Sequence, residues 1–239
     1  MSKLNSAWVV QPHGPLEEVA PGVLCVQGSI VMPLGKFPRR MTVVEVRGGS
    51  AIWSAIPLAE TEMSKIEALG PVKFLIVPNK AHRLDLRAWC NRYPQAKVIA
   101  PPEAVPAASE AAIVAADHDI IHDPALTLEL IPGLKADEFA MTIRREGDTT
   151  LVLNDILAHV AHPEGIGATI MAHLFAFGVT RPRTSRPVRR AFVKDDAVVA
   201  NQFRTWALIP DLKRVIVSHG DIIRNDPAGA LRRAAEDYD

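Results

Sequence analysis

The chain has 239 residues, of which 48% are hydrophobic, and its 27 basic side chains balance 27 acidic ones. This composition supports a sizeable buried core and excludes an intrinsically disordered chain. A net charge of zero gives no general electrostatic attraction to nucleic acid or to an anionic membrane, so neither partner is expected.

The two cysteines, Cys25 and Cys90, lie far apart and form no CxxC pattern. This favours reduced thiols in a cytoplasmic protein over a disulfide framework. The N-terminal residues lack the long apolar stretch of a secretory signal, and no run approaches the roughly 20 apolar residues of a membrane helix. We therefore expect a soluble globular protein with a single domain over residues 1–239.

The first third of the chain predicts short strands, rich in β-branched and aromatic residues and separated by glycine or proline. These strands are expected over residues 22–29, 41–46 and 50–55. Gly48 and Gly49 predict a hairpin turn between the last two.

Helices then alternate with buried strands. Residues 59–70 place apolar side chains at helical spacing, with acidic residues in the first turn and Gly70 as a C-terminal cap. A helix over 84–94, ended by Pro94, is flanked by continuous apolar runs that predict buried strands over 73–77 and 96–100.

The second half repeats this alternation. Strands are predicted over 126–131, 139–145, 150–155 and 214–220, and helices over 198–209 and 227–237. Residues 156–178 predict no clear element. We interpret the order of elements as an αββα sandwich, in which two mixed sheets face each other with helices outside.

Three polar residues follow the carboxyl ends of predicted buried strands: His82, Asp155 and His219. For each residue alone, a structural role such as helix capping is the commoner one. Loops that leave the same edge of a sheet bring distant residues together, so the coincidence of three favours a shared site. Imidazole and carboxylate groups are suitable ligands for zinc, iron or manganese.

This pattern resembles the metallo-β-lactamase-like superfamily over nearly the whole chain. The resemblance is carried by GVLCVQGS, RMTVVEV, SAIWSA, FLIVPNKAHRLD, TLVLND and VIVSHG. More narrowly, P-N-x-x-H, W-x-x-x-Y-P and S-H-G are similar to a bacterial branch of that superfamily. The resemblance implies an αββα sandwich in which Asp155 takes the place of the aspartate that bridges two metals. His219 takes the place of the last metal-binding histidine.

The loop that carries the superfamily's H-x-H-x-D-H motif has one histidine here. With His82 in the middle place, Lys80, Leu84 and Asp85 fill the other positions; with His82 first, these become Leu84, Leu86 and Arg87. Neither register restores the motif. A further histidine expected in a Pro-Gly turn is absent from IPGLKADEF, where Asp137 and Glu138 are the nearby ligand-capable residues. The resemblance therefore implies a degenerate site with one metal ion rather than two.

The candidate metal ligands are His82, Asp155, His219 and Glu138. Asp155 is also a candidate catalytic residue that positions a water, and Asp85 is a candidate general base in place of the motif's missing aspartate. The cofactor is expected to be one zinc, iron or manganese ion, or none.

Two functions follow from this site. The first is a metal-dependent hydrolase with a mononuclear centre, acting on a small molecule. The second is a non-catalytic relative whose cleft binds a ligand or partner and whose site residues are hydrogen-bonded remnants. Iron-dependent redox chemistry on the same ligands has no separate support, and a homodimer is consistent with this class.

Other polar groups are better explained as surface features. His118 and His122 are expected in a solvated turn, and His159, His162 and His173 on loop and helix surfaces. The basic residues of 181–190 could hold an anion, but a solvated loop is the favoured interpretation.

Overall fold

The structure, a computed structural model, describes residues 4–32, 35–115 and 118–239. The chain forms two compact units, and each is built from two segments of sequence. The first unit contains Met1–Ser29 and Arg40–Leu126, and the second contains Ile30–Arg39 and Thr127–Asp239. The prediction of one domain over 1–239 stays a prediction.

A six-stranded sheet has the order β1-β2-β3-β4-β5-β6. Its hairpins are antiparallel, whereas β4, β5 and β6 run parallel to one another. The end of β2 from Ile30 and the start of β3 up to Arg39 belong to the second unit. The strands are β1 (Glu17–Ala20), β2 (Val23–Met32), β3 (Gly35–Val46), β4 (Gly49–Trp53), β5 (Val72–Ile76) and β6 (Lys97–Ile99).

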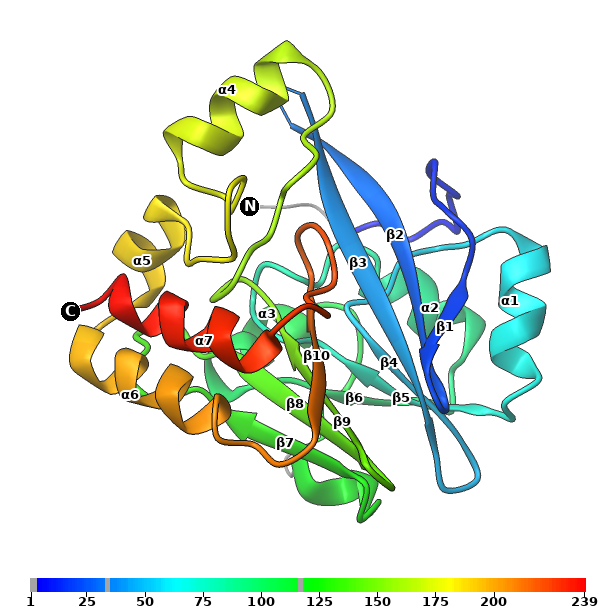
Figure 1. Ribbon diagram of the computed structural model, residues 1–239. Helices are drawn as coiled ribbons and strands as arrows, with labels where there is room; N and C mark the ends of the chain where they lie inside the picture. The colour runs from blue at the N-terminus through cyan, green and yellow to red at the C-terminus, as the bar shows by residue number, and fades with distance from the viewer. Residues whose placement is uncertain (1–3, 33–34, 116–117) are drawn as a thin grey trace. The chain divides into compact units, whose positions relative to one another are not determined.

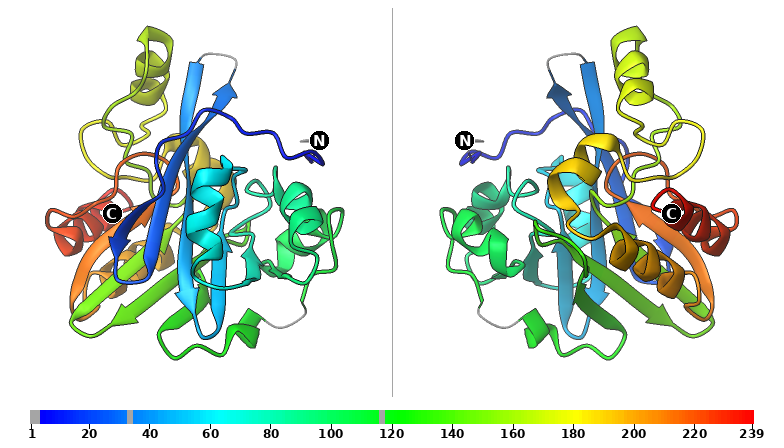
Figure 2. Two further views of the ribbon diagram at one scale, coloured as in Figure 1. Left: turned by 90° about the vertical axis from the view of Figure 1, so that its right-hand side faces the viewer. Right: turned by 90° about the vertical axis from the view of Figure 1, so that its left-hand side faces the viewer.

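Helices pack on this sheet through their apolar faces. Met63 and Ile66 of α1 and Trp89 of α2 are fully buried in one core cluster with residues of β3, β4 and β5. Figure 2 shows α1 lying along the sheet. The helical segments of the first unit are α1 (Glu60–Glu67), α2 (Leu86–Arg92), α3 (Val105–Ala108), η1 (Pro102–Ala104) and η2 (His118–Ile121).

The second sheet has four strands in the order β10-β9-β8-β7. β9 pairs with β8 in antiparallel and with β10 in parallel orientation. The second halves of β9 and β10, Leu151–Leu153 and Val215–Val217, are buried and are continuous apolar runs. The strands are β7 (Leu126–Leu130), β8 (Phe139–Arg145), β9 (Asp148–Leu153) and β10 (Leu212–Val217).

Helices α6 and α7 lie side by side against this sheet (Figure 1). Phe203 and Trp206 of α6 and Leu231 of α7 form the second core cluster with β9 and β10. The helices of the second unit are α4 (Ile166–Leu174), α5 (Arg186–Phe192), α6 (Asp196–Trp206) and α7 (Pro227–Glu236).

The predicted elements are confirmed where their hydrophobic pattern was periodic or continuous. The Gly48-Gly49 hairpin joins β3 to β4, and both glycines have positive φ. Strand β1 was missed because its sequence, EEVA, is polar at an exposed sheet edge. Helix α4 was missed because apolar residues occur on its exposed face as well as its buried one, which removes the amphipathic pattern.

The expectation of a solvated loop over 181–190 is wrong in part, because helix α5 begins within this segment at Arg186. Arg181 and Arg183 pair with Asp237 beyond the end of α7, and Arg189 pairs with Asp196. The guanidinium of Arg189 also lies over the ring of Tyr238 at 4.7 Å. Arg181, Arg183 and Arg189 therefore bind the C-terminal residues to segment 181–190 within the second unit.

Within the part of the chain that the structure describes, no helix has both the length and the apolar character needed to cross a membrane.

An ion pair joins the starts of β9 and β10. Both terminal guanidinium nitrogens of Arg214 contact Asp148, with Nη2 to Oδ2 at 2.6 Å, and Nη1 also donates to Thr150 Oγ1 at 2.6 Å. The hydrogen bond and positive charge of Arg214 lower the pKa of the Asp148 carboxyl. Arg214 is buried, so losing its partner leaves a charge without compensation.

We predict that Asp148→Asn lowers the free energy of unfolding by roughly 3 kcal/mol at pH 7. Since the folded pKa is lowered, this contribution is present above the ordinary aspartate pKa of about 3.9 and is lost as pH falls through the folded value. Urea unfolding at several pH values measures it. Glu17→Gln, on the exposed edge strand, is the control; equal effects of the two changes, or a difference that does not shrink as pH is lowered, contradict the assignment.

Candidate metal centre

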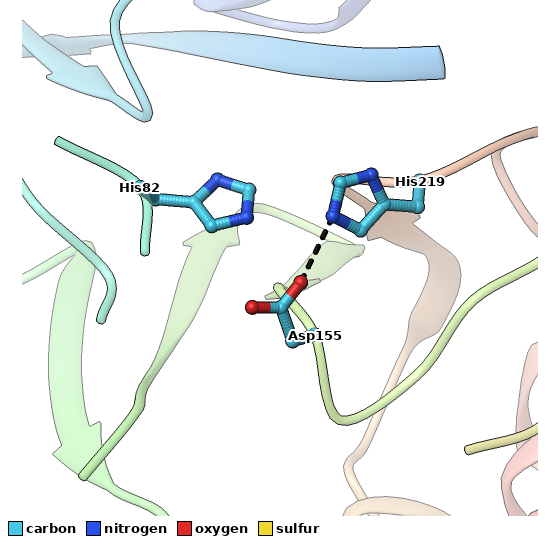
Figure 3. A group of neighbouring side chains, drawn as sticks. All are labelled: His82, Asp155 and His219. Carbon is cyan, nitrogen blue, oxygen red and sulfur yellow. Dashed lines mark hydrogen bonds and ion pairs between the residues drawn. The ribbon is translucent and has the colours of Figure 1, made fainter. Parts of the chain in front are cut away.

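Asp155 and His219 meet because β9 and β10 are parallel and in register. Leu153 pairs with Val217 at the ends of these strands, and Asp155 and His219 each lie two residues further on. His219 Nε2 lies 2.9 Å from Asp155 Oδ1, as Figure 3 shows. Both side chains are nine-tenths buried or close to it. The strand pairing thus places two metal-binding groups side by side.

The other ring nitrogen of His219 fixes the tautomer. Nδ1 lies 2.8 Å from the carbonyl oxygen of Pro38, which can only accept a hydrogen bond, so Nδ1 carries a proton. The ring of Phe37 lies 4.9 Å from the imidazole. Nε2 is therefore the nitrogen directed at Asp155, and a neutral His219 would present a lone pair there.

Charge also links this pair. Burial disfavours the imidazolium form, but the hydrogen bond and negative charge of Asp155, together with the Pro38 carbonyl, outweigh burial and raise the pKa of His219. Without a metal, the pair is therefore an imidazolium and a carboxylate over a wider pH range than for an exposed histidine. A metal ion would have to displace the Nε2 proton.

Glu138 holds the backbone of the loop that carries Asp155. It is fully buried just before β8, and its two carboxylate oxygens accept hydrogen bonds from Asp155 N at 3.1 Å and Ile156 N at 3.0 Å. These bonds fix the main chain at the position where the Asp155 side chain leaves it. The geometry favours a positioning role for Glu138, and its role as a metal ligand stays a prediction.

The loop after β10 is fixed through Gly220 and His159. The backbone of His159 bonds to His219 O at 2.9 Å and to Asp221 N at 2.7 Å. Gly220 has φ 104°, and a Cβ there would overlap the carbonyl oxygen of His159. The glycine in S-H-G is therefore required for the close approach of these two loops.

His82 lies in the first unit, in the turn after β5. Its Nδ1 is 2.8 Å from the hydroxyl of Ser54, and its backbone N–H donates to Asn79 O. Asn79 is fully buried, and its side-chain oxygen accepts a hydrogen bond from Ala81 N at 2.9 Å. Ser54 adopts a left-handed conformation, φ 55°, at the end of β4. The Pro-Asn break thus builds an ordered turn that orients the histidine ring.

The other candidate residues have different surroundings. Asp85 is buried next to the start of α2, and its Oδ1 accepts a hydrogen bond from Asn5 Nδ2 at 2.8 Å. His162 is exposed and pairs with Asp221, and His173 is exposed on α4. His159 contributes mainly through its backbone. The role of Asp85 as a general base stays a prediction.

The solved structures that resemble this chain identify its fold. They include the metallo-β-lactamase FIM-1 from Pseudomonas aeruginosa in its mono-zinc form, at 16% identity and TM-score 0.61, covering 97% of this chain and 98% of that one. An Erythrobacter litoralis metallo-β-lactamase with β-mercaptoethanol in the active site has 15% identity and TM-score 0.61, and the match covers 93% of this chain and 96% of that one. A Hirschia baltica metallo-β-lactamase has 14% identity and TM-score 0.57, and the match covers 93% of this chain and 98% of that one.

Neither a protein-family model nor a curated protein matches the sequence. The structural likeness extends over almost the whole chain, which has a metallo-β-lactamase-like fold. The expected αββα fold class is confirmed. At these identities the likeness establishes the fold alone.

Three supporting groups were missed from the sequence: the Ser54 hydroxyl, the Pro38 carbonyl and the positioning role of Glu138. The Pro38 carbonyl has no side-chain signal, and its partner His219 is 181 residues away. Glu138 had a usable signal, because an acidic residue next to a buried strand needs hydrogen-bond donors.

We predict that Glu138→Gln lowers the free energy of unfolding by about 1–3 kcal/mol, because an amide NH₂ replaces one of two buried acceptors. Urea denaturation of the metal-free protein measures the change. Glu146→Gln, the same chemical change in the exposed β8–β9 turn, should alter stability by less than about 0.5 kcal/mol. A neutral Glu138→Gln variant contradicts the positioning role.

We also predict that Asp155→Asn lowers the pKa of His219 in metal-free protein, because the hydrogen bond and charge that raise it are lost while burial remains. Nitrogen-15 NMR titration of the imidazole measures this pKa. The His162→Gln variant removes an exposed histidine and should leave the His219 titration unchanged. An unaltered pKa in Asp155→Asn contradicts the ionic coupling.

Proposed function

We propose that this protein is a metal-dependent hydrolase with a mononuclear site, in which His82, Asp155 and His219 bind one ion and the substrate is a small molecule. Two imidazoles and one carboxylate form a ligand set suited to zinc or iron(II). The observation that carries the proposal is the Asp155–His219 pair, two ligand atoms 2.9 Å apart at the ends of adjacent parallel strands.

The surroundings of the proposed ligands support metal binding. Metal-binding histidines usually donate a hydrogen bond from the N–H of their second ring nitrogen to an oxygen. This bond fixes the tautomer and raises the basicity of the ligand nitrogen. His219 does so through Nδ1 to Pro38 O. His82 has its Nδ1 beside Ser54 Oγ, which directs Nε2 away from that hydroxyl. Both rings are thus oriented to offer Nε2.

A bound zinc ion would polarise a substrate oxygen and lower the pKa of a water to about 7. The protein's own residues then have separate tasks. Asp155 would be a metal ligand and would position a water. Glu138 holds the Asp155 backbone, and Asp85 is the proposed proton acceptor in place of the motif's aspartate. The cytoplasmic location expected from the cysteines accords with this role but stays a prediction.

A second function is favoured by the same pair of side chains. Because the Asp155 carboxylate and the His219 imidazolium satisfy each other directly, the second unit keeps this arrangement without any ion. A non-catalytic relative that binds a ligand or partner would retain these hydrogen bonds for stability alone. The two functions differ in metal dependence.

We predict near-stoichiometric zinc, iron or manganese in protein purified without chelator or nickel affinity, measured by elemental analysis. Zinc titrated into chelator-treated protein should bind one ion per chain and raise the midpoint of thermal unfolding. His82→Gln, Asp155→Asn and His219→Gln should each weaken zinc binding by roughly 100-fold, because each removes a ligand. Affinity should rise with pH as the Nε2 proton of His219 is released.

The control is His162→Gln, an exposed histidine that should leave zinc binding unchanged. Zinc-dependent hydrolysis of chromogenic esters and phosphodiesters, lost in Asp155→Asn, would separate a hydrolase from a metal-binding protein without activity. Background metal content, with stability unaffected by chelator, rules out the hydrolase and leaves the non-catalytic relative.

A further inference from the structure

A basic surface cavity lies within the first unit, away from the turn that carries His82. Its volume is about 490 Å³, and it is formed at the amino ends of β5 and β6. His82 follows the carboxyl end of β5, so the two features lie at opposite ends of that strand. Its lining includes Arg47, Lys73, Phe74, Lys97, Ile120 and Ile121.

Positive charge in this cavity is not balanced by ion pairs within the part of the chain that the structure describes. Among those residues, Arg47, Lys73 and Lys97 form no ion pair. Lys73 Nζ donates a hydrogen bond to Arg47 O at 3.2 Å, which keeps the ammonium close to the base of the Arg47 side chain. Lys97 pairs with Phe74, so these two side chains share one face of the sheet and Lys73 points to the other; both lysines line the cavity at the amino ends of the strands.

The carboxylate of Asp123 lies nearby and offsets part of this charge, but in the described structure it forms no ion pair with the three cations. Its Oδ2 accepts a hydrogen bond from Arg47 N at 2.8 Å, and its Oδ1 accepts one from Ala125 N at 2.9 Å. Both oxygens therefore bind backbone amides and fix the segment that follows His122, a further lining residue. Three cations gathered at one cavity repel one another, and an anion would relieve that repulsion.

The remaining wall is apolar. Phe74 is buried in β5, and Ile120 and Ile121 are half-buried beside it in the cavity lining. A cavity of this volume is large enough for a small organic molecule rather than only an inorganic ion. The ligand should therefore combine an anionic group with an apolar body.

We propose that this cavity binds a small phosphate monoester, with the phosphoryl group among Arg47, Lys73 and Lys97 and the apolar body against Ile120 and Ile121. Arginine and lysine both suit phosphate oxygens, and a phosphate dianion balances more of this charge than a single carboxylate does. The proposal is independent of any metal and of the hydrolase function.

Phenyl phosphate, inorganic phosphate and benzoate are the probes, measured by titration calorimetry in metal-depleted protein and buffer so that no ion binds them elsewhere. We expect phenyl phosphate to bind at least tenfold more tightly than either of the others, and less tightly as salt rises. Lys73→Gln/Lys97→Gln should weaken phenyl phosphate binding at least tenfold, and Lys73→Arg/Lys97→Arg should retain it.

The matched control is Lys213→Gln/Arg232→Gln, which removes two exposed cations from the second unit and should leave binding within twofold of wild type. Equal weakening by the two double glutamine variants would overturn the proposal in favour of general electrostatic attraction. Equal affinities for phenyl phosphate and inorganic phosphate, or no binding at millimolar concentration, would also overturn it. Circular dichroism of each variant excludes loss of the fold as the cause.

Discussion

The parallel register of β9 and β10 is the constraint on which the candidate site depends. Because Leu153 lies opposite Val217, both strands end at the same level and their next side chains emerge together. A shift of one residue would turn Asp155 or His219 toward the other face of the sheet. The buried apolar residues of both strands oppose such a shift, so the site is positioned by the hydrophobic core.

This strand pair carries an acid–base pair at each end, and the two differ in what they can do. Near the amino ends of the two strands Asp148 binds Arg214, and just past their carboxyl ends Asp155 binds His219. Arginine keeps its proton at any pH at which the protein is folded, so the first pair stays ionic until the Asp148 carboxyl is protonated at low pH. Histidine can release its proton and become a ligand. Similar geometry thus gives a pair that titrates only at low pH at one end and a pair with a titratable imidazole at the other.

Much of the fold was predictable from the sequence because buried strands consist mainly of apolar residues. LVL and VIV are continuous apolar runs, and each is predicted correctly to lie in the interior. The approach of Asp155 to His219 followed from their shared position after such strands. The Pro38 carbonyl could not be foreseen, since backbone groups are the same in every residue. Likewise, α4 has exposed Ile166, Ile170 and Leu174, so its sequence carries no contrast between buried and exposed faces.

The second unit is made from an early segment, Ile30–Arg39, and a late one, Thr127–Asp239. During synthesis, Phe37 and Pro38 leave the ribosome long before His219 exists, and 181 residues separate the two ends of the Pro38–His219 hydrogen bond. Contacts at such separation form late, because a long loop must close first. His219 therefore reaches its partners only after the chain that separates it from Pro38 has been synthesised, and the Asp155–His219 pair cannot form before residue 219 has emerged.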